Sequence, residues 1–169
     1  MIDLETLDVK PSAVILTVGA VKFNPQTISA RDELQELYMR VDINEQDKLN
    51  RSISENTVTW WQTQDEEVQN EAFTDEGRLQ LSNVIEEINK FVWNSGKVWS
   101  QGSFDINILE NLYNSLDISP PWQYWQVRDS RTLFDYVDGS LDKTINLHNA
   151  LEDAAQQALA VQRALSKIR

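Results

Sequence analysis

Two acidic residues near the start of the chain have a spacing that favours a shared site. Asp3 and Glu5 flank Leu4, so on a β-strand both carboxylates leave one face while Leu4 points toward a core. Two adjacent like charges cost free energy unless a cation lies between them. The pair therefore indicates either a divalent-cation site or an ordinary solvated strand edge, and by itself it favours the edge.

The segment from His148 to Asp153 places the only histidine of the chain close to another acid. Asn149, with Glu152 three positions later, is typical of a capping box and predicts that Asn149 caps the last helix. His148 and Asp153 then occupy the two positions whose side chains meet in a hydrophobic staple. The segment fits either an imidazole held for catalysis by a carboxylate, or a partly exposed histidine near an acid that complements the helix dipole.

A further acid, Asp105, lies between the strand-like segment 97–100 and a segment with helical periodicity. The carboxyl ends of sheet strands commonly open onto a site, so Asp105 is a candidate ligand. The alternative is that Asp105 serves only as a helix N-cap.

Alternation and periodicity predict the elements that would hold these residues. Strands are expected near 3–5 and over 13–23, 34–41, 97–100 and 125–127, although a helical interpretation of 34–41 is nearly as good. Helices are expected over about 54–61, 65–72, 78–94, 105–116, 132–137 and 150–167. This order predicts an α/β fold with one mixed five-stranded sheet, its first three strands antiparallel, flanked by helices.

Composition limits the chemistry that this chain can perform. Its 169 residues suit a single domain, 1–169, and the absence of cysteine excludes disulfides, thiolate zinc sites and cysteine nucleophiles. No apolar run approaches the roughly 18 residues of a membrane span, so we expect a cytoplasmic protein without a membrane partner. The net charge of -12 opposes a broad electrostatic grip on nucleic acid, unless clustered acids bind cations that reverse the local sign.

Three blocks of sequence, in chain order, resemble the motifs of the DEDDh-type 3'-5' exonucleases. These blocks are MIDLETLD, SQGSFDINILE and HNALEDA, and together they span nearly the whole chain. The longer segment DLETLDVKPSAVILTVGAVKFNP, with RDSRTLFD later, is more similar to the RNase T-like and exodeoxyribonuclease VIII-like subgroup of phages and bacteria.

The resemblance implies a ribonuclease H-like fold and a two-metal mechanism with Mg²⁺, for which Mn²⁺ would be a substitute. Asp3, Glu5 and Asp153 would bind the metal that activates water, Asp3 would bridge to the second metal, and Asp105 would complete the site. His148 would act as general base, a task that suits an imidazole with an ordinary pKa near ~6.5.

The resemblance also implies a substrate and the residues that contact it. The substrate would be single-stranded or 3'-overhang nucleic acid, with DNA favoured, in the cytoplasm of a bacterium or a phage-infected host. The contacts implied by the resemblance are Thr6, Leu7 and Phe104. By residue type, Trp61 is a candidate either for stacking on a base or for the core, and Arg131 either for holding a phosphate or for a solvated surface position. Two alternatives stay open, an exoribonuclease that trims RNA and an inactive acidic interaction protein of the same fold; the oligomeric state, including a homodimer, is also open.

Overall fold

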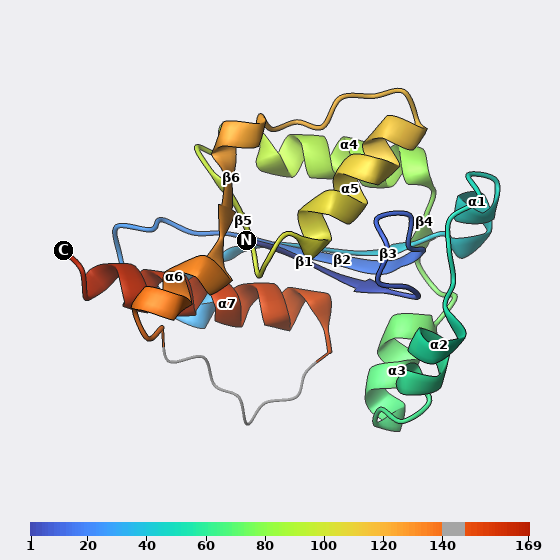
Figure 1. The fold of residues 1–169 in the computed structure, drawn as a ribbon, viewed down its shortest axis with the longest axis horizontal. Coiled ribbons are helices and arrows are strands. Elements are labelled where there is room, and N and C mark those ends of the chain that lie inside the picture. The colour runs from blue at the N-terminus through green and yellow to red at the C-terminus, as the bar shows by residue number, and fades with distance from the viewer. Residues whose placement is uncertain (140–147) are drawn as a thin grey trace.

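A computed structural model describes residues 1–139 and 148–169 of the chain. Strands β1 (Ile2–Thr6), β2 (Ile15–Lys22) and β3 (Gln35–Val41) form an antiparallel meander, and the short β4 (Arg78–Leu79) pairs parallel to β3. Strands β5 (Val98–Ser100) and β6 (Val127–Asp129) pair parallel to each other, and β5 lies beside β1. Figure 1 shows the strands as one central layer.

Helices cover both faces of this layer. On one face lie α4 (Leu81–Val92) and α5 (Phe104–Ser115), and on the other lie α6 (Ser130–Tyr136) and α7 (Ala150–Ser166) (Figure 1). The shorter helices α1 (Ile43–Asp47), α2 (Glu55–Trp61) and α3 (Glu66–Phe73) gather near the β4 end of the sheet. The 3₁₀ turns are η1 (Arg31–Glu33) and η2 (Tyr124–Gln126). In the part of the chain that the structure describes, no helix is long and apolar enough to cross a bilayer.

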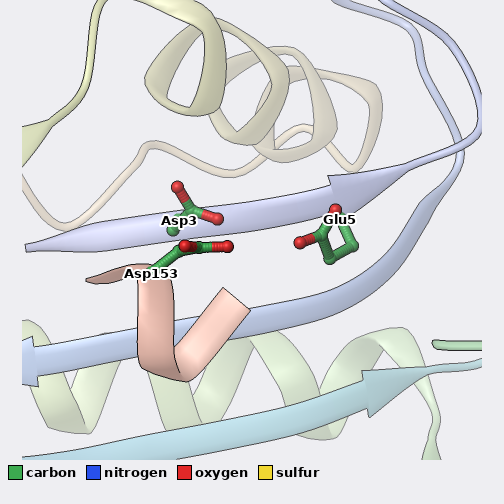
Figure 2. Close-up of side chains that lie close together, drawn as sticks. All are labelled: Asp3, Glu5 and Asp153. Carbon is green, nitrogen blue, oxygen red and sulfur yellow. The ribbon is translucent and has the colours of Figure 1, made fainter. Parts of the chain in front are cut away.

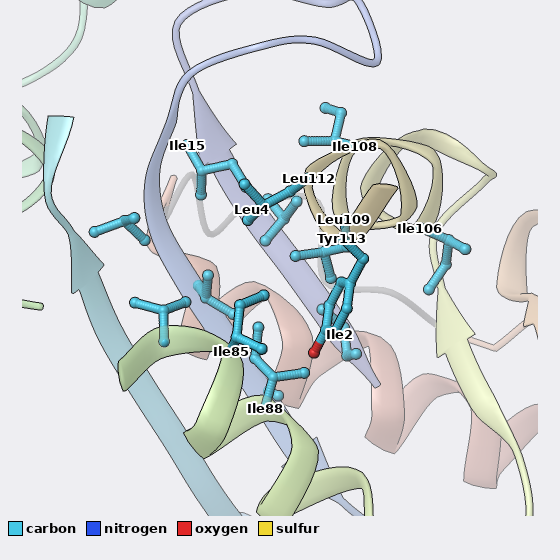
Figure 3. Close-up of a cluster of buried hydrophobic side chains, with 14 of the residues drawn as sticks. Ile2, Leu4, Ile15, Ile85, Ile88, Ile106, Ile108, Leu109, Leu112 and Tyr113 are labelled. Atoms are coloured by element: carbon cyan, nitrogen blue, oxygen red, sulfur yellow. The ribbon is translucent and has the colours of Figure 1, made fainter. Parts of the chain in front are cut away.

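The main core lies between the sheet and the helices α4 and α5. Ile2 and Leu4 of β1 point into it and meet apolar side chains of both helices (Figure 3). Each fully buried aliphatic side chain of this kind contributes roughly 1.5–3 kcal/mol. Because alternate residues of a strand face opposite sides, the burial of Ile2 and Leu4 turns Asp3 and Glu5 toward α7.

Several sequence predictions about the fold are confirmed. The fold is α/β, and its first three strands are antiparallel. Residues 35–41 form a strand, which settles the ambiguity between strand and helix at 34–41.

Two predictions about the sheet and its neighbouring helix need correction. The described residues hold six strands, arranged as a four-stranded and a two-stranded sheet, in place of one five-stranded sheet. The additional strand is β4, which occupies the predicted start of the helix at residue 78. Arg78 and Leu79 pair with Arg40 and Val41 of β3, so α4 begins only at Leu81.

Candidate active site

Acids from the two ends of the chain converge between β1 and α7. Asp3 and Glu5 project from β1, and Asp153 projects from the first turn of α7 toward them (Figure 2). One carboxylate oxygen from each residue can be chosen so that all three lie within 4.8 Å of one another. The strand spacing predicted from the sequence thus produces a cluster that a single ion could contact.

A glycine in the neighbouring strand allows α7 to approach the sheet so closely. Gly19 of β2 pairs with Asp3 in the sheet. A Cβ atom added at Gly19 would lie only 2.1 Å from the backbone carbon of Ala150, the first residue of α7. Any other residue would therefore push the start of the helix, and Asp153 with it, away from Asp3. We did not assign a role to Gly19 from the sequence, although a glycine inside a Val- and Ile-rich strand is a signal of close backbone approach.

The predicted cap of α7 is present. The side-chain oxygen of Asn149 accepts hydrogen bonds from the backbone amides of Leu151 and Glu152, both at 3.1 Å. The carboxylate of Glu152 pairs with the guanidinium of Arg31, where a capping box would have it accept from the Asn149 amide. The N-cap and this ion pair fix the first turn of α7, which carries Asp153.

Gln157 is a second residue of this site that the sequence did not single out. It lies one turn after Asp153, is 6% exposed, and donates a 2.8 Å hydrogen bond from Nε2 to Asp3 Oδ1. Its Oε1 atom is buried and has no hydrogen-bond partner in the described structure. The signal that could have revealed Gln157 is its position four residues after Asp153, on the same face of the helix.

Asp105 lies beside the three-acid cluster but outside its 4.8 Å group. Ser103 occupies the N-cap position of α5, so Asp105 belongs to the first helical turn and is not the cap. Its carboxylate is 4% exposed and accepts a 3.1 Å hydrogen bond from the backbone amide of Leu4. Asp105 therefore contacts β1 between the two acids of that strand.

Burial and mutual repulsion disfavour the ionised forms of these acids. Burial raises the pKa of Asp3 well above its usual range, and the charges of Asp105, Glu5 and Asp153 raise it further. The pKa of Glu5 rises to about 8 because of burial and the charges of Asp153 and Asp105. Burial also raises the pKa of Asp105 to about 7 and that of Asp153 to about 6. A cation among these carboxylates would relieve both costs.

His148 precedes the Asn149 cap, as predicted, and its imidazole is half-buried. From the sequence we expect its ring to meet Asp153; the ring contact in the structure is with Trp60 of α2, with ring centroids 4.8 Å apart and an interplanar angle of 89°. Burial lowers the pKa of His148, which keeps the imidazole neutral and able to accept a proton at neutral pH.

Three of the five predicted substrate contacts have buried side chains. Trp61 is 1% exposed and donates from Nε1 to the carbonyl oxygen of Thr6 at 2.9 Å. Its indole is therefore not available for stacking on a base, which corrects the prediction. Leu7 is also buried, as is Thr6, whose hydroxyl donates to the Asp8 carbonyl at 2.8 Å. The Thr6 carbonyl already accepts from Trp61, and the Leu7 amide donates to the Val14 carbonyl oxygen at 2.9 Å.

The other two predicted contacts line one surface pocket. Phe104 is half-buried against the main core, and Arg131 is exposed at the start of α6. Both border a pocket that also includes Gly102 and Asp129. The positive charge of Arg131 acts on Asp105, where it lowers the pKa that burial has raised. The charge of one pocket residue, Arg131, therefore acts on Asp105, the acid beside the three-acid cluster.

Comparison with known proteins relates the chain to a family of enzymes. A family model described as the 3'-5' exoribonuclease Rv2179c-like domain matches residues 1–165. A search of curated proteins found no match. The family match covers the acids of β1, Asp105, His148 and Asp153 together.

Proposed function

Because this chain belongs to the family of Rv2179c-like 3'-5' exoribonuclease domains, we propose that it shortens RNA from its 3' end by metal-assisted hydrolysis. Membership makes the chain a 3'-5' exonuclease, a hydrolase that acts on phosphodiester bonds of nucleic acid. The observation that carries the proposed mechanism is the convergence of Asp3, Glu5 and Asp153 within 4.8 Å.

RNA is the preferred substrate in this proposal, and DNA is the second candidate. The description of the family is that of exoribonucleases. From the sequence alone we instead favour DNA, with trimming of RNA as the alternative. Assignment to the RNase T-like and exodeoxyribonuclease VIII-like subgroup of DEDDh enzymes remains part of the proposal, as does a preference for single strands or 3' overhangs.

The residues of the cluster fit a hard divalent cation. Mg²⁺ prefers carboxylate and water oxygens, and the cluster offers carboxylates whose pKa values are raised by burial and by the charges of neighbouring acids. Two such cations, when bound, would polarise the phosphate and stabilise the attacking and leaving oxygens. We assign Asp3, Glu5 and Asp153 to the first ion, and Asp3 and Asp105 to the second, with Mn²⁺ as a substitute for Mg²⁺.

His148 is the proposed general base. Its neutral imidazole would take the proton from the attacking water, and a lowered pKa keeps it in that form at neutral pH. It lies immediately before the Asn149 cap of the helix that carries Asp153. The start of α7 thus places the proposed base, His148, near Asp153, a proposed metal ligand.

The pocket bordered by Phe104 and Arg131 is the proposed site of the 3'-terminal nucleotide. Arg131 supplies a positive charge for a phosphate, and Phe104 an apolar surface for the base or sugar. Val9 and Pro11, which follow β1 in the chain, border the same pocket and would form another part of its wall. The local positive charge of Arg131 would offset part of the repulsion that the acidic chain exerts on the substrate.

The proposal is tested with matched RNA and DNA single strands of one sequence, labelled at the 5' end. Each is incubated with Mg²⁺, with Mn²⁺ or with EDTA, beside an Asp3→Asn protein purified in the same way. We expect stepwise shortening of RNA from the 3' end, faster than that of DNA, which stops in EDTA and is absent in the variant.

The outcomes separate the parts of the proposal. Faster shortening of DNA would reverse the substrate preference while leaving the exonuclease in place. Activity that persists in EDTA or in Asp3→Asn would refute the metal site. Intact substrates under every condition would favour the acidic binding protein of the same fold.

A further inference from the structure

Trp60 of α2 stands between the buried core and His148. Its indole is 39% exposed, although its helix neighbour Trp61 is 1% exposed. Trp60 packs edge to face on Trp61, with ring centroids 5.0 Å apart, and edge to face on His148, with centroids 4.8 Å apart. The three rings form a continuous path from the core to the imidazole.

The inner end of this path is fixed to the strand that carries the acids. The Trp61 indole donates to the Thr6 carbonyl oxygen at 2.9 Å, one residue after Glu5. Phe73 of α3 also packs edge to face on Trp61, with ring centroids 5.4 Å apart. Trp60 therefore packs on Trp61, a side chain that cannot shift without breaking its contacts to β1 and α3.

The outer end of the path has a backbone conformation that needs support. His148 has a φ of 36°, in the left-handed region that side chains other than glycine rarely adopt. Such conformations persist where the surroundings favour them, and they concentrate at functional sites. On one side Asn149 fixes the start of α7, and on the other Trp60 contacts the imidazole.

We propose that Trp60 is a positioning residue that holds the His148 imidazole in place for proton transfer. This inference rests on the proposed function, in which His148 is the base. Trp60 lies on α2, far from α7 in the sequence. Through Trp61 it is connected to β1, which carries Asp3 and Glu5, and through its own indole it contacts His148. The competing role for an exposed tryptophan beside a nuclease site is stacking on a base of the substrate.

A kinetic double-mutant cycle distinguishes the two roles. We expect Trp60→Leu to lower kcat by about 10-fold, with KM for the oligonucleotide unchanged, because the imidazole is present but no longer held. Trp60→Phe should retain most of the activity, since an aromatic edge remains. In a His148→Ala background, Trp60→Leu should cause no further loss. Trp93→Leu, at a 73% exposed tryptophan after α4, is the matched control and should leave kcat unchanged.

An NMR measurement tests the contact without relying on activity. His148 is the only histidine in the chain, so its ring proton signals can be assigned directly. Trp60→Phe and Trp60→Leu should both shift these signals through the lost indole ring current, whereas Trp93→Leu should not. Unshifted signals in a folded Trp60 variant would overturn the proposal.

Other results would also overturn it, and they differ from a failure of the proposed function. A rise in KM that persists in the His148→Ala background would assign Trp60 to base stacking. Wild-type kcat in His148→Ala would refute the roles of His148 as general base and of Trp60 as its positioning residue. The proposal of metal-dependent hydrolysis of RNA would still stand. Absence of any nuclease activity in the wild-type protein would refute the proposed function itself.

Discussion

Gln157 donates a 2.8 Å hydrogen bond to Asp3, joining the long C-terminal helix α7 to the first strand. The bond is made to Oδ1 of Asp3, whose carboxylate also belongs to the cluster with Glu5 and Asp153. It also opposes the rise in the Asp3 pKa that burial and the neighbouring acids cause. A neutral amide can do this without adding to the positive charge of a bound ion.

Replacing Gln157 should weaken metal binding before it affects the fold. Gln157→Leu removes the donor that orients Asp3, and changes of this kind beside a metal ligand typically reduce affinity by about 10- to 100-fold. The measurement is calorimetric titration of the metal-free protein with Mn²⁺. Gln156→Leu, at the half-buried neighbour on α7, is the control. Equal Mn²⁺ affinities for the two variants would exclude a role for Gln157 in holding Asp3.

Gly19→Ala should be among the most damaging small substitutions in the chain. The added methyl group would meet the backbone of Ala150 at 2.1 Å, and backbone cannot move aside as a flexible side chain can. We expect a loss of roughly 3 kcal/mol in the free energy of unfolding, at the upper end for an overpacked core, and weaker Mn²⁺ binding as Asp153 moves from Asp3.

Gly96→Ala provides the control for this substitution. A Cβ at Gly96 would have no atom within 4 Å, so we expect its free energy of unfolding to stay near the wild-type value or to rise slightly. The measurement is urea denaturation of both variants. A Gly19→Ala protein as stable as Gly96→Ala would show that α7 does not rest on β2 as described.

The features that could be predicted from the sequence are those set by neighbouring residues. The Asn149 cap depends on atoms two and three residues away, and the shared face of Asp3 and Glu5 follows from strand alternation. Their convergence with Asp153 was reached through the resemblance of three motifs, because nothing in the spacing of residues 150 positions apart indicates that they meet.

The features that the sequence did not predict depend on packing between distant segments. Either indole of the Trp60–Trp61 pair could have faced the core, and the choice of Trp61 follows from its hydrogen bond to Thr6 and its contact with Phe73. Strand β4 has only two residues, so its alternation is too short to detect. The pairing of Arg78 with Arg40 of β3 defines it.

His148→Ala should separate catalysis from metal binding. Loss of a general base lowers turnover by about 100-fold or more, whereas Mn²⁺ affinity should stay within about twofold, since the three acids within 4.8 Å are unchanged. Asp3→Asn should lose both properties. The measurements are kcat on an RNA oligonucleotide and calorimetric titration with Mn²⁺. Wild-type turnover in His148→Ala would show that another group accepts the proton.

The wild-type pH profile should follow the same imidazole. Burial lowers the pKa of His148, so its imidazole loses its proton at a lower pH than a free histidine does. We expect kcat at saturating Mg²⁺ to rise with pH on the acid side, with a midpoint below the ordinary histidine pKa of about 6.5, and then to be level. In His148→Ala this acid limb should disappear from the residual activity, which a stopped assay over pH 5 to 8 can measure.

In the absence of metal, the stability of the protein should fall as pH rises. Glu5 has an ordinary pKa of 4.5 that the fold raises to about 8, so its contribution is full below pH 4.5 and is lost as pH rises toward 8. The pKa of Asp105 is raised to about 7 and that of Asp153 to about 6, so both acids act in the same direction. The Met1 amine acts oppositely, because burial lowers its pKa to about 5.

Comparison with Glu5→Gln cancels the contribution of Met1 and isolates that of Glu5. In EDTA, we expect the free energy of unfolding of the wild-type protein to fall relative to Glu5→Gln by on the order of a few kcal/mol between pH 5 and pH 8. Saturating Mn²⁺ should abolish this fall, because a bound cation favours the ionised carboxylates and releases their protons. Urea denaturation at each pH measures both effects. Parallel curves for the two proteins in EDTA would mean that Glu5 is not held among buried acids, and a Mn²⁺ effect independent of pH would place the ion elsewhere.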